Sequence, residues 1–179
     1  MIKPPDTFTT ARLRARVPRV GDAAAAFQAY ANDPEVTRFL TWKPHERIET
    51  LAVFLLGSII NWENGKGPFN WMLSPLDSDA IIGSIGVTIA DGKALFGYVL
   101  ARSHWGRGLL PEALGWLVGW SLAQPEIFRA YAFCDVENAA SARVMEKAGM
   151  AREGVLRRWH TCPTISPEPR DCVMFAKVR

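Results

Sequence analysis

Two glycines separated by one residue are the strongest constraint on how this chain can fold. Gly106 and Gly108 follow an apolar, strand-like run (residues 94–101) and precede a helix-like run (residues 109–122). Glycine tolerates a left-handed backbone and lets N–H groups converge without interference from a Cβ atom. The N-terminus of a helix adds unpaired N–H donors and a partial positive charge. The order strand, glycine turn, helix therefore predicts a phosphate or pyrophosphate site, with Arg107 as a further positive charge.

Spacing excludes two common phosphate-binding motifs. A P-loop requires a lysine after its second glycine, and no lysine follows Gly108. A dinucleotide-binding fingerprint requires a third glycine where Pro111 stands, and it usually opens the first strand–helix–strand unit of a fold. A tight strand-to-helix turn that binds no ligand stays open as the alternative.

The length of 179 residues and the absence of a Gly/Ser-rich linker predict a single domain over residues 1–179. Asp91-Gly92 is a hairpin signal, and Asp22 is expected to cap the first helix. The first half gives a meander and the second half gives crossovers, so we expect a mixed sheet in an α/β or α+β sandwich. The predicted strands are residues 11–17, 71–75, 80–90, 94–101, 128–136 and 172–178, and the predicted helices are residues 23–32, 47–62, 109–122 and 141–149.

A second candidate turn lies in the segment DVENAASARVMEKAGM (residues 135–150). Asn138 and Ser141 stand at the start of its helix, where both can cap backbone groups. Two consecutive crossovers would place this turn beside the glycine turn, at the carboxyl ends of the strands where ligands bind. Helix capping alone and a ligand site shared by both turns are the two interpretations.

Composition narrows the classes of function. The net charge of +3 is too small to indicate nucleic-acid binding, although it favours an anionic ligand. Three cysteines argue against a disulfide framework, and no stretch suits a signal peptide or a membrane span, so we expect a cytoplasmic protein that does not bind membranes. His160, Cys162 and Cys172 match no zinc spacing, and we expect no metal site.

Several segments together resemble one enzyme family. TTARLRAR near the start, NDPEVTRFL, GYVLARSHWGRGLLPEAL and NAASARVMEKAGMAREGVLR are similar to the GNAT superfamily of N-acetyltransferases, and among them to the ribosomal-protein N-terminal acetyltransferases of the RimJ/RimL branch. The resemblance implies a GNAT-like fold, with a mixed, mostly antiparallel sheet, a central splayed strand pair and flanking helices. It also implies acetyl-CoA as the co-substrate of an acyltransferase.

The resemblance also implies which residues bind coenzyme A. The family's pyrophosphate turn corresponds to residues 103–108, where Ser103 replaces the usual Gln or Arg and Arg102 or Arg107 would compensate. The family's splayed strand, here residues 98–101, offers free backbone groups to the pantetheine arm, and Asn138 matches the asparagine that contacts this arm. The coenzyme-binding residues so implied are Val99, Leu100, Ala101, Trp105, Gly106, Arg107, Gly108, Leu109, Leu110, Asn138 and Ser141.

The catalytic groups implied by the resemblance depart from the commonest pattern. Many members carry a tyrosine seven residues after the asparagine as general acid, but this chain has Met145 there. The ribosomal branch offers a serine, matched by Ser141, to protonate the leaving thiolate. A backbone N–H near Leu100 would stabilise the oxyanion. His160 is the candidate base, because the ordinary histidine pKa lies near working pH, and His45 is the runner-up.

The acceptor is expected to be a primary amine that attacks the thioester directly, above all a protein N-terminal α-amine. An α-amine of pKa about 7.8 is roughly a third neutral at about pH 7.5, whereas a lysine side chain is about 0.1% neutral. A small amine (aminoglycoside or polyamine), a non-catalytic acyl-CoA-binding module and homodimerisation stay open. Trp42, Trp62 and Trp159 are candidates to surround the acceptor, and Cys134 is interpreted as an inert buried thiol that could form a disulfide with free coenzyme A.

Overall fold

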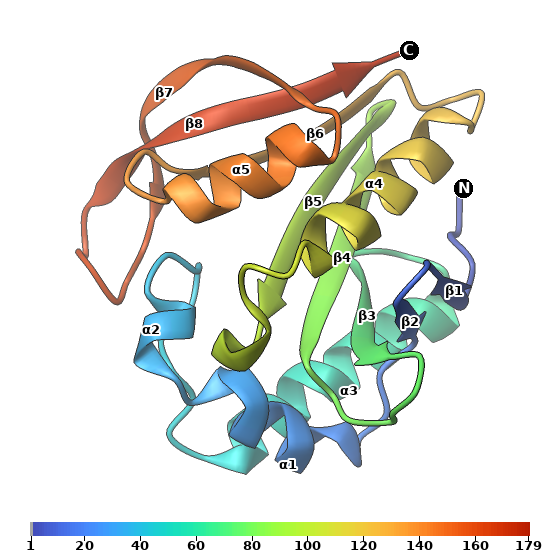
Figure 1. The fold of residues 1–179 in the computed structure, drawn as a ribbon, viewed down its shortest axis with the longest axis vertical. Coiled ribbons are helices and arrows are strands. Elements are labelled where there is room, and N and C mark those ends of the chain that lie inside the picture. Colours follow the sequence, from blue (N-terminus) through green and yellow to red (C-terminus); the bar gives the residue numbers. More distant parts are fainter. Residues whose placement is uncertain (1) are drawn as a thin grey trace.

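One eight-stranded sheet runs through the computed structural model, which describes residues 2–179, so that Met1 lies outside the described residues (Figure 1). The strand order is β1-β2-β3-β4-β5-β6-β8-β7. The strands are β1 (Thr7–Thr9), β2 (Leu13–Arg16), β3 (Phe69–Pro75), β4 (Gly83–Ala90), β5 (Lys93–Leu100), β6 (Arg129–Asp135), β7 (Ala151–Thr161) and β8 (Pro169–Val178). The helices are α1 (Asp22–Ala26), which continues as a π-helical turn (Phe27–Ala31), α2 (Pro34–Thr37), α3 (Ile48–Asn64), α4 (Leu109–Leu122) and α5 (Ala139–Lys147).

Local sequence explains where several of these elements begin and end. Asp91 and Gly92 both have positive φ (49° and 70°), which a tight two-residue hairpin turn requires, and they join β4 to β5 as predicted. Asp33 caps α2 by accepting a hydrogen bond of 2.9 Å from the N–H of Glu35. Helix α3 ends at Gly65, whose φ of 65° is left-handed. Helix α4 has the bounds that the sequence predicts.

The central strands β5 and β6 form the parallel pair of the sheet and then separate. They pair only where Lys93–Leu95 faces Arg129–Tyr131, and beyond these positions the two strands diverge (Figure 1). The other strand pairs within residues 2–179 are antiparallel. The expected mixed, mostly antiparallel sheet with a central splayed pair is therefore confirmed.

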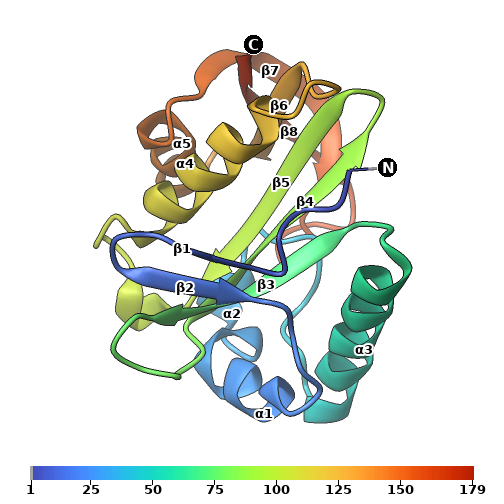
Figure 2. The same cartoon turned by 90° about the vertical axis from the view of Figure 1, so that its right-hand side faces the viewer.

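Helices cover both faces of this sheet (Figure 2). Helices α4 and α5 lie on one face, where Leu114 and Leu117 of α4 belong to a large core cluster with Trp71 and Phe96 of the sheet. Helices α1 and α3 lie on the other face over a smaller cluster that includes Met72. Because side chains alternate along a strand, β5 contributes to both layers and separates them.

Two strands were not predicted, and one of them changes the topology. Strand β7 carries mostly exposed side chains on both of its faces, so it shows no alternation of apolar and polar residues, and its basic run at residues 152–158 resembles a solvated face. Strand β1 has only three residues. The second crossover leads from β6 through α5 to β7, and β8 then returns to lie between them, antiparallel to both.

The predicted cap of the first helix is wrong. Asp22 is the first residue of α1, Gly21 is the N-cap, and no side chain caps the helix there. The carboxylate of Asp22 instead accepts hydrogen bonds from the guanidinium of Arg16 (2.6 and 2.8 Å) and from the N–H of Arg19 (2.7 Å). An arginine on the preceding strand competes successfully for this carboxylate because an ionic hydrogen bond is stronger than a neutral one.

A buried ion pair joins the end of β6 to β8. Asp135 is 2% exposed and accepts hydrogen bonds from Arg170 (2.5 and 3.2 Å) and from the N–H of Glu137 (2.9 Å). Burial acts to raise the pKa of Asp135, but these hydrogen bonds and the charge of Arg170 outweigh it and hold the pKa below its ordinary value. The pair therefore stabilises the fold above the pKa of an unfolded aspartate, and this contribution is lost as pH falls through the lower folded pKa.

We expect Asp135→Asn to reduce the free energy of unfolding by about 3 kcal/mol at neutral pH, because it leaves the Arg170 charge without its buried partner. Denaturant unfolding at pH 7 and at low pH measures this, and the difference between variant and wild type should shrink on acidification. Asp79→Asn is the control, because Asp79 pairs with Arg14 while almost fully exposed, and should change stability by less than about 1 kcal/mol. Equal losses in the two variants would contradict the prediction.

Candidate active site

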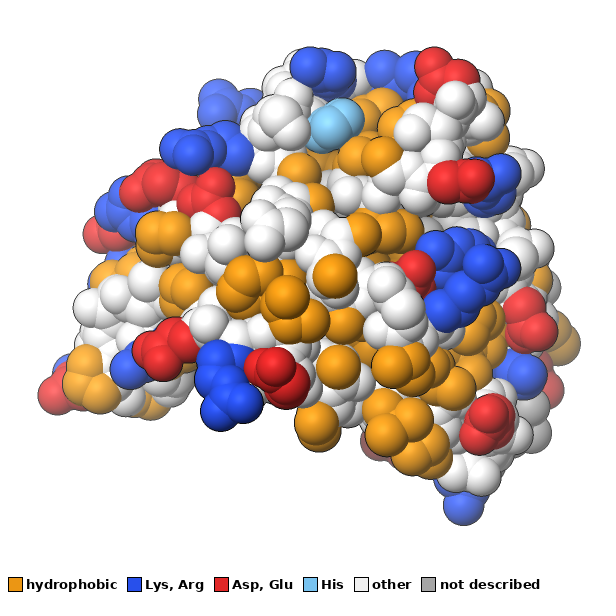
Figure 3. All heavy atoms as spheres, turned by 90° about the horizontal axis from the view of Figure 1, so that it is seen from below, with side chains coloured by type: hydrophobic (Ala, Val, Ile, Leu, Met, Phe, Trp, Pro, Cys, Tyr) orange, Lys and Arg blue, Asp and Glu red, His pale blue; other side chains and the backbone are white. Residues whose placement is uncertain are grey.

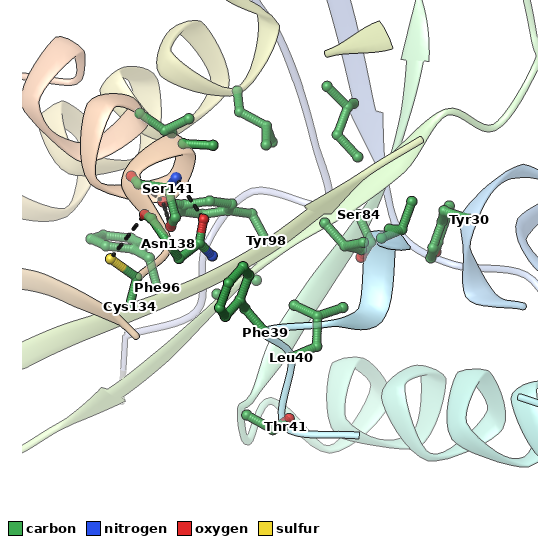
Figure 4. Close-up of a pocket in the computed structure, with 18 of the residues that line it drawn as sticks. Tyr30, Phe39, Leu40, Thr41, Ser84, Phe96, Tyr98, Cys134, Asn138 and Ser141 are labelled. Carbon is green, nitrogen blue, oxygen red and sulfur yellow. Dashed lines mark hydrogen bonds between the residues drawn. The ribbon is translucent and has the colours of Figure 1, made fainter. Parts of the chain in front are cut away.

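A cavity of about 990 Å³ lies where β5 and β6 separate, and residues from both faces of the sheet line it. We call its two parts the turn side and the loop side. The turn side is lined by Trp105, Gly106, Gly108, Leu109, Asn138 and Ser141, and the loop side by Tyr30, Phe39, Trp42, His45, Phe54 and Phe133. Figure 4 shows Asn138 and Ser141 at one end and Tyr30 at the other, with Phe39 between them. Viewed from below, hydrophobic side chains form a band across the middle of the molecule (Figure 3).

The glycine turn has the geometry that an anion site needs. Gly106 and Gly108 both have φ of 74°, which only glycine adopts without strain, and a Cβ atom at Gly106 would meet nothing within 4 Å. Gly108 is the N-cap of α4 and no side chain caps this helix. The first N–H groups of α4 are therefore left for a ligand, at the positive end of the helix dipole.

Arg12 braces this turn, and sequence reasoning did not find it. Its Nη1 donates to the carbonyl of Arg107 (2.8 Å), while its backbone N–H and Nε both donate to the carboxylate of Glu112 (2.8 Å each). Burial acts to raise the pKa of Glu112, but hydrogen bonds from Thr10 and Arg12 outweigh it, so the pKa is lowered and the carboxylate stays ionised. No spacing rule relates residue 12 to residue 107, because the contact depends on how β2 approaches α4.

Arg102 and Arg107, which were expected to compensate for Ser103, do not line the cavity. Arg102 forms an ion pair with Asp33 (3.3 Å), and the hydroxyl of Ser103 contacts Nδ1 of His104 (3.0 Å). The side chain of Arg107 is exposed and does not line the cavity, and Ala101 is buried beside the smaller core. The backbone N–H groups of the turn are therefore the candidate anion-binding groups on the cavity wall.

The splay leaves backbone groups of β5 facing the gap. The N–H of Ala101 donates to Ile82 (2.7 Å), and antiparallel pairing alternates, so the backbone of Val99 faces β4 whereas that of Leu100 faces β6. The indole N–H of Trp105 donates to the carbonyl of Leu100 (2.7 Å). Because β6 no longer pairs there, the N–H of Leu100 is left as a donor directed into the gap.

The start of α5 carries the helix cap, Asn138, and the candidate general acid, Ser141. Asn138 caps the helix by accepting a hydrogen bond from the N–H of Ser141 (3.1 Å), so capping is part of its role. The hydroxyl of Ser141 is 2.7 Å from the hydroxyl of Tyr98 on β5, a residue that the sequence did not single out as catalytic (Figure 4). Met145 is fully buried in the core. Cys134 is also buried, and burial raises the pKa of its thiol to about 11, which disfavours the reactive thiolate.

Both candidate bases line the cavity, and burial lowers the pKa of both histidines. His160 packs on Phe133 (ring centroids 5.1 Å apart), and its Nε2 is buried without a hydrogen-bond partner among the described residues. His45 is held differently: Nδ1 lies 2.7 Å from Oγ1 of Thr50, whose own proton goes to the carbonyl of Arg47 (2.7 Å). Nδ1 of His45 must then donate, which leaves the lone pair on Nε2.

The loop side is mostly aromatic and apolar. Of the three tryptophans expected around an acceptor, only Trp42 lines the cavity. Trp62 is 3% exposed in the core, where its N–H donates to the carbonyl of Asn70 (2.9 Å), and Trp159 is half-exposed on the edge strand β7.

Within residues 2–179 no three His, Cys, Asp or Glu side chains are placed to hold a metal ion, and no helix is long and apolar enough to cross a membrane.

Comparison with known proteins agrees with this geometry. Residues 12–151 match the family model of the acetyltransferase (GNAT) domain. The uncharacterized N-acetyltransferase p20 of Bacillus licheniformis is 30% identical over 156 residues, which cover 85% of this chain and 86% of p20.

Solved acetyltransferase structures share the fold, among them the following two. The microcin C7 self-immunity acetyltransferase MccE, solved with acetyl-CoA and AMP, has a TM-score of 0.85 at 20% identity, with 98% of each chain covered. RimL, a ribosomal-protein alpha-N-protein acetyltransferase solved with coenzyme A as a disulfide to a cysteine, has a TM-score of 0.82 at 20% identity, covering 96% of this chain and 97% of RimL.

We expect Gly108→Trp to weaken coenzyme A binding at least about 100-fold, because the new side chain occupies the turn and strains a left-handed position. Isothermal titration calorimetry with coenzyme A measures the loss, and circular dichroism checks that the fold is retained. Gly119→Ala is the matched control, because Gly119 lies in open space on the same helix. Unchanged binding in Gly108→Trp would show that the turn is only a connection.

Proposed function

The chain belongs to the GNAT family of acetyltransferases and is an acetyl-CoA-dependent N-acetyltransferase, and we propose that its acceptor is the α-amine of a peptide or protein N-terminus. The observation that carries this proposal is the lining of the loop side, where aromatic and apolar side chains predominate. Its carboxylates are few: Glu35 is exposed near Arg38, and Asp135 is paired with Arg170. Such a lining suits an amine on an apolar or neutral body and disfavours a polycation.

The acceptor must lose its charge before it attacks. Because about a third of an α-amine is neutral near pH 7.5, against about 0.1% of a lysine side chain, an α-amine needs only a modest base. The lowered pKa values of His45 and His160 keep both histidines neutral and able to accept a proton at that pH. His45 is the stronger candidate for the base, because Thr50 fixes its tautomer and its Nε2 is not enclosed.

The residues on the turn side fit coenzyme A. The free N–H groups at the start of α4, with Gly106 and Gly108, would hold its pyrophosphate. When bound, the coenzyme supplies an acetyl thioester as the electrophile. Leu100 and Ser141 both line the cavity, and in this proposal the N–H of Leu100 would stabilise the oxyanion while the hydroxyl of Ser141 would serve the leaving sulfur.

An acceptor panel tests the proposal. With acetyl-CoA, we expect peptides that carry a free α-amine to be acetylated with a kcat/KM at least about 100-fold above that of N-blocked peptides with one lysine, because the neutral fractions differ by more than that factor. Mass spectrometry identifies the acetylated nitrogen. Preference for a polyamine or an aminoglycoside would contradict the proposal, and coenzyme binding without any turnover would favour a non-catalytic module.

A Gly97→Leu variant tests, in the same panel, whether the acceptor occupies this cavity. Gly97 lines the cavity on β5, and a Cβ atom there would meet nothing within 4 Å. The leucine should raise KM for the acceptor about tenfold or more while leaving coenzyme A affinity unchanged. Gly57→Leu, exposed on α3 with equal free space and outside the cavity, should change neither constant.

The pH profile distinguishes the two histidines. As the pH decreases, the base and the amine both become protonated, so log kcat/KM should fall. The slope against pH should be one between the pKa values of the two groups and two below both. We expect His45→Gln to leave a slope of one throughout, with kcat/KM at pH 7 reduced about 100-fold. If His160→Gln removes the second slope instead, His160 is the base. If neither does, water takes the proton.

A further inference from the structure

One tyrosine spans the gap in the sheet and meets the proposed catalytic serine. Tyr98 lies on β5 and reaches the first turn of α5, where its hydroxyl is 2.7 Å from Oγ of Ser141 and 3.2 Å from the carbonyl of the same residue (Figure 4). The thiol of Cys134 is the other side-chain group that interacts with the Ser141 hydroxyl, and burial keeps that thiol protonated. Both residues line the cavity, so this pair belongs to the wall that faces a bound coenzyme.

The helix does not need the hydroxyl of Ser141. Asn138 already supplies the cap, by accepting the hydrogen bond from the N–H of Ser141. The carbonyl of Ser141 lies inside α5 and has an N–H partner one turn later. The Tyr98 hydroxyl therefore donates its single proton to Oγ of Ser141, which is the shorter of its two contacts. In that arrangement the proton of Ser141 remains free to reach a third atom.

We propose that Tyr98 is a positioning residue, which donates its proton to Ser141 and thereby directs the Ser141 hydroxyl as a hydrogen-bond donor to the coenzyme sulfur. This goes beyond the acceptor proposal, because it concerns the leaving group rather than the amine. It rests only on coenzyme A binding at the turn side.

The chemistry assigns hydrogen bonding rather than proton loss to this pair. A thiol loses its proton more readily than a phenol or an alcohol, with an ordinary pKa of about 8.5 for cysteine, and burial raises the pKa of Tyr98 further above its already higher ordinary value. In the transfer, the amine nitrogen forms a bond to the acyl carbon, the carbon–sulfur bond breaks, and its electron pair goes to sulfur. The amine proton leaves through a base to solvent, and sulfur takes a proton from solvent. Ser141 and Tyr98 keep their protons throughout and stabilise the thiolate as it forms.

Coenzyme binding at different pH values tests this without an acceptor. Calorimetry compares coenzyme A with desulfo-coenzyme A between about pH 6.5 and pH 9.5. A donor directed at sulfur binds the thiolate more tightly, so the ratio of the two affinities should rise about tenfold with pH. Tyr98→Phe and Ser141→Ala should abolish the rise without changing desulfo-coenzyme A affinity, and Ser141→Thr should retain it. A rise that persists in Tyr98→Phe would overturn the proposal.

A double-mutant cycle in kcat gives the second test. We expect Tyr98→Phe to lower kcat about tenfold at unchanged acceptor KM, and Tyr98→Phe to have no further effect in the Ser141→Ala background. Tyr131→Phe removes the same hydroxyl group on β6 outside the cavity and should change nothing. Additive losses in the cycle, or a lowered melting temperature with no loss of kcat, would show that Tyr98 only packs the core. If no amine is acetylated, the acceptor proposal fails while the calorimetric test still decides this one.

Discussion

An unpaired backbone edge inside a sheet is costly unless other groups bond to its N–H and C=O groups, and the gap between β5 and β6 creates two such edges. Neither strand can move to close the gap, because β4 pairs along the whole of β5 and β8 pairs along the whole of β6. Trp105 bonds one carbonyl of this edge. The remaining groups are available to a ligand, so the cavity follows from a mismatch in pairing that the rest of the sheet holds in place.

Two ionic braces fix the ends of this gap. At the glycine turn, Arg12, which directly precedes β2, bonds the carbonyl of Arg107 and the carboxylate of Glu112. At the end of β6, Arg170 ties β8 to Asp135. Both braces use arginine, whose planar fork bonds two acceptors at once and resists reorientation. The turn and the start of α5 are therefore held relative to each other by strands outside the site, which is how a loop-borne site acquires a defined geometry.

Sequence patterns predicted the parts of this site that depend on neighbouring residues. The glycine turn, the Asp91-Gly92 hairpin and the cap at Asn138 each obey a local rule, and each is present. Arg12 and Tyr98 act on partners far along the chain, so no local rule could reveal them. The edge strand β7 has no buried face, so its sequence shows no alternation of apolar and polar residues. Trp62 lies in the core and Trp159 is half-exposed on β7, so neither lines the cavity, because an aromatic residue type does not specify whether a side chain is packed in the core or exposed.

The two ends of the site differ in charge, and this difference affects which acceptors can bind. The positive end of α4 suits phosphates on the turn side, next to exposed Arg107. His45 on the loop side, and His160 beside Phe133, have pKa values lowered by burial, and the loop side has few carboxylates. A cation entering there loses hydration without gaining a partner, whereas a neutral amine does not. The same apolar wall that raises the cost of a charged acceptor keeps the histidines unprotonated, so desolvation, and not charge recognition, would select the reactive form of the amine.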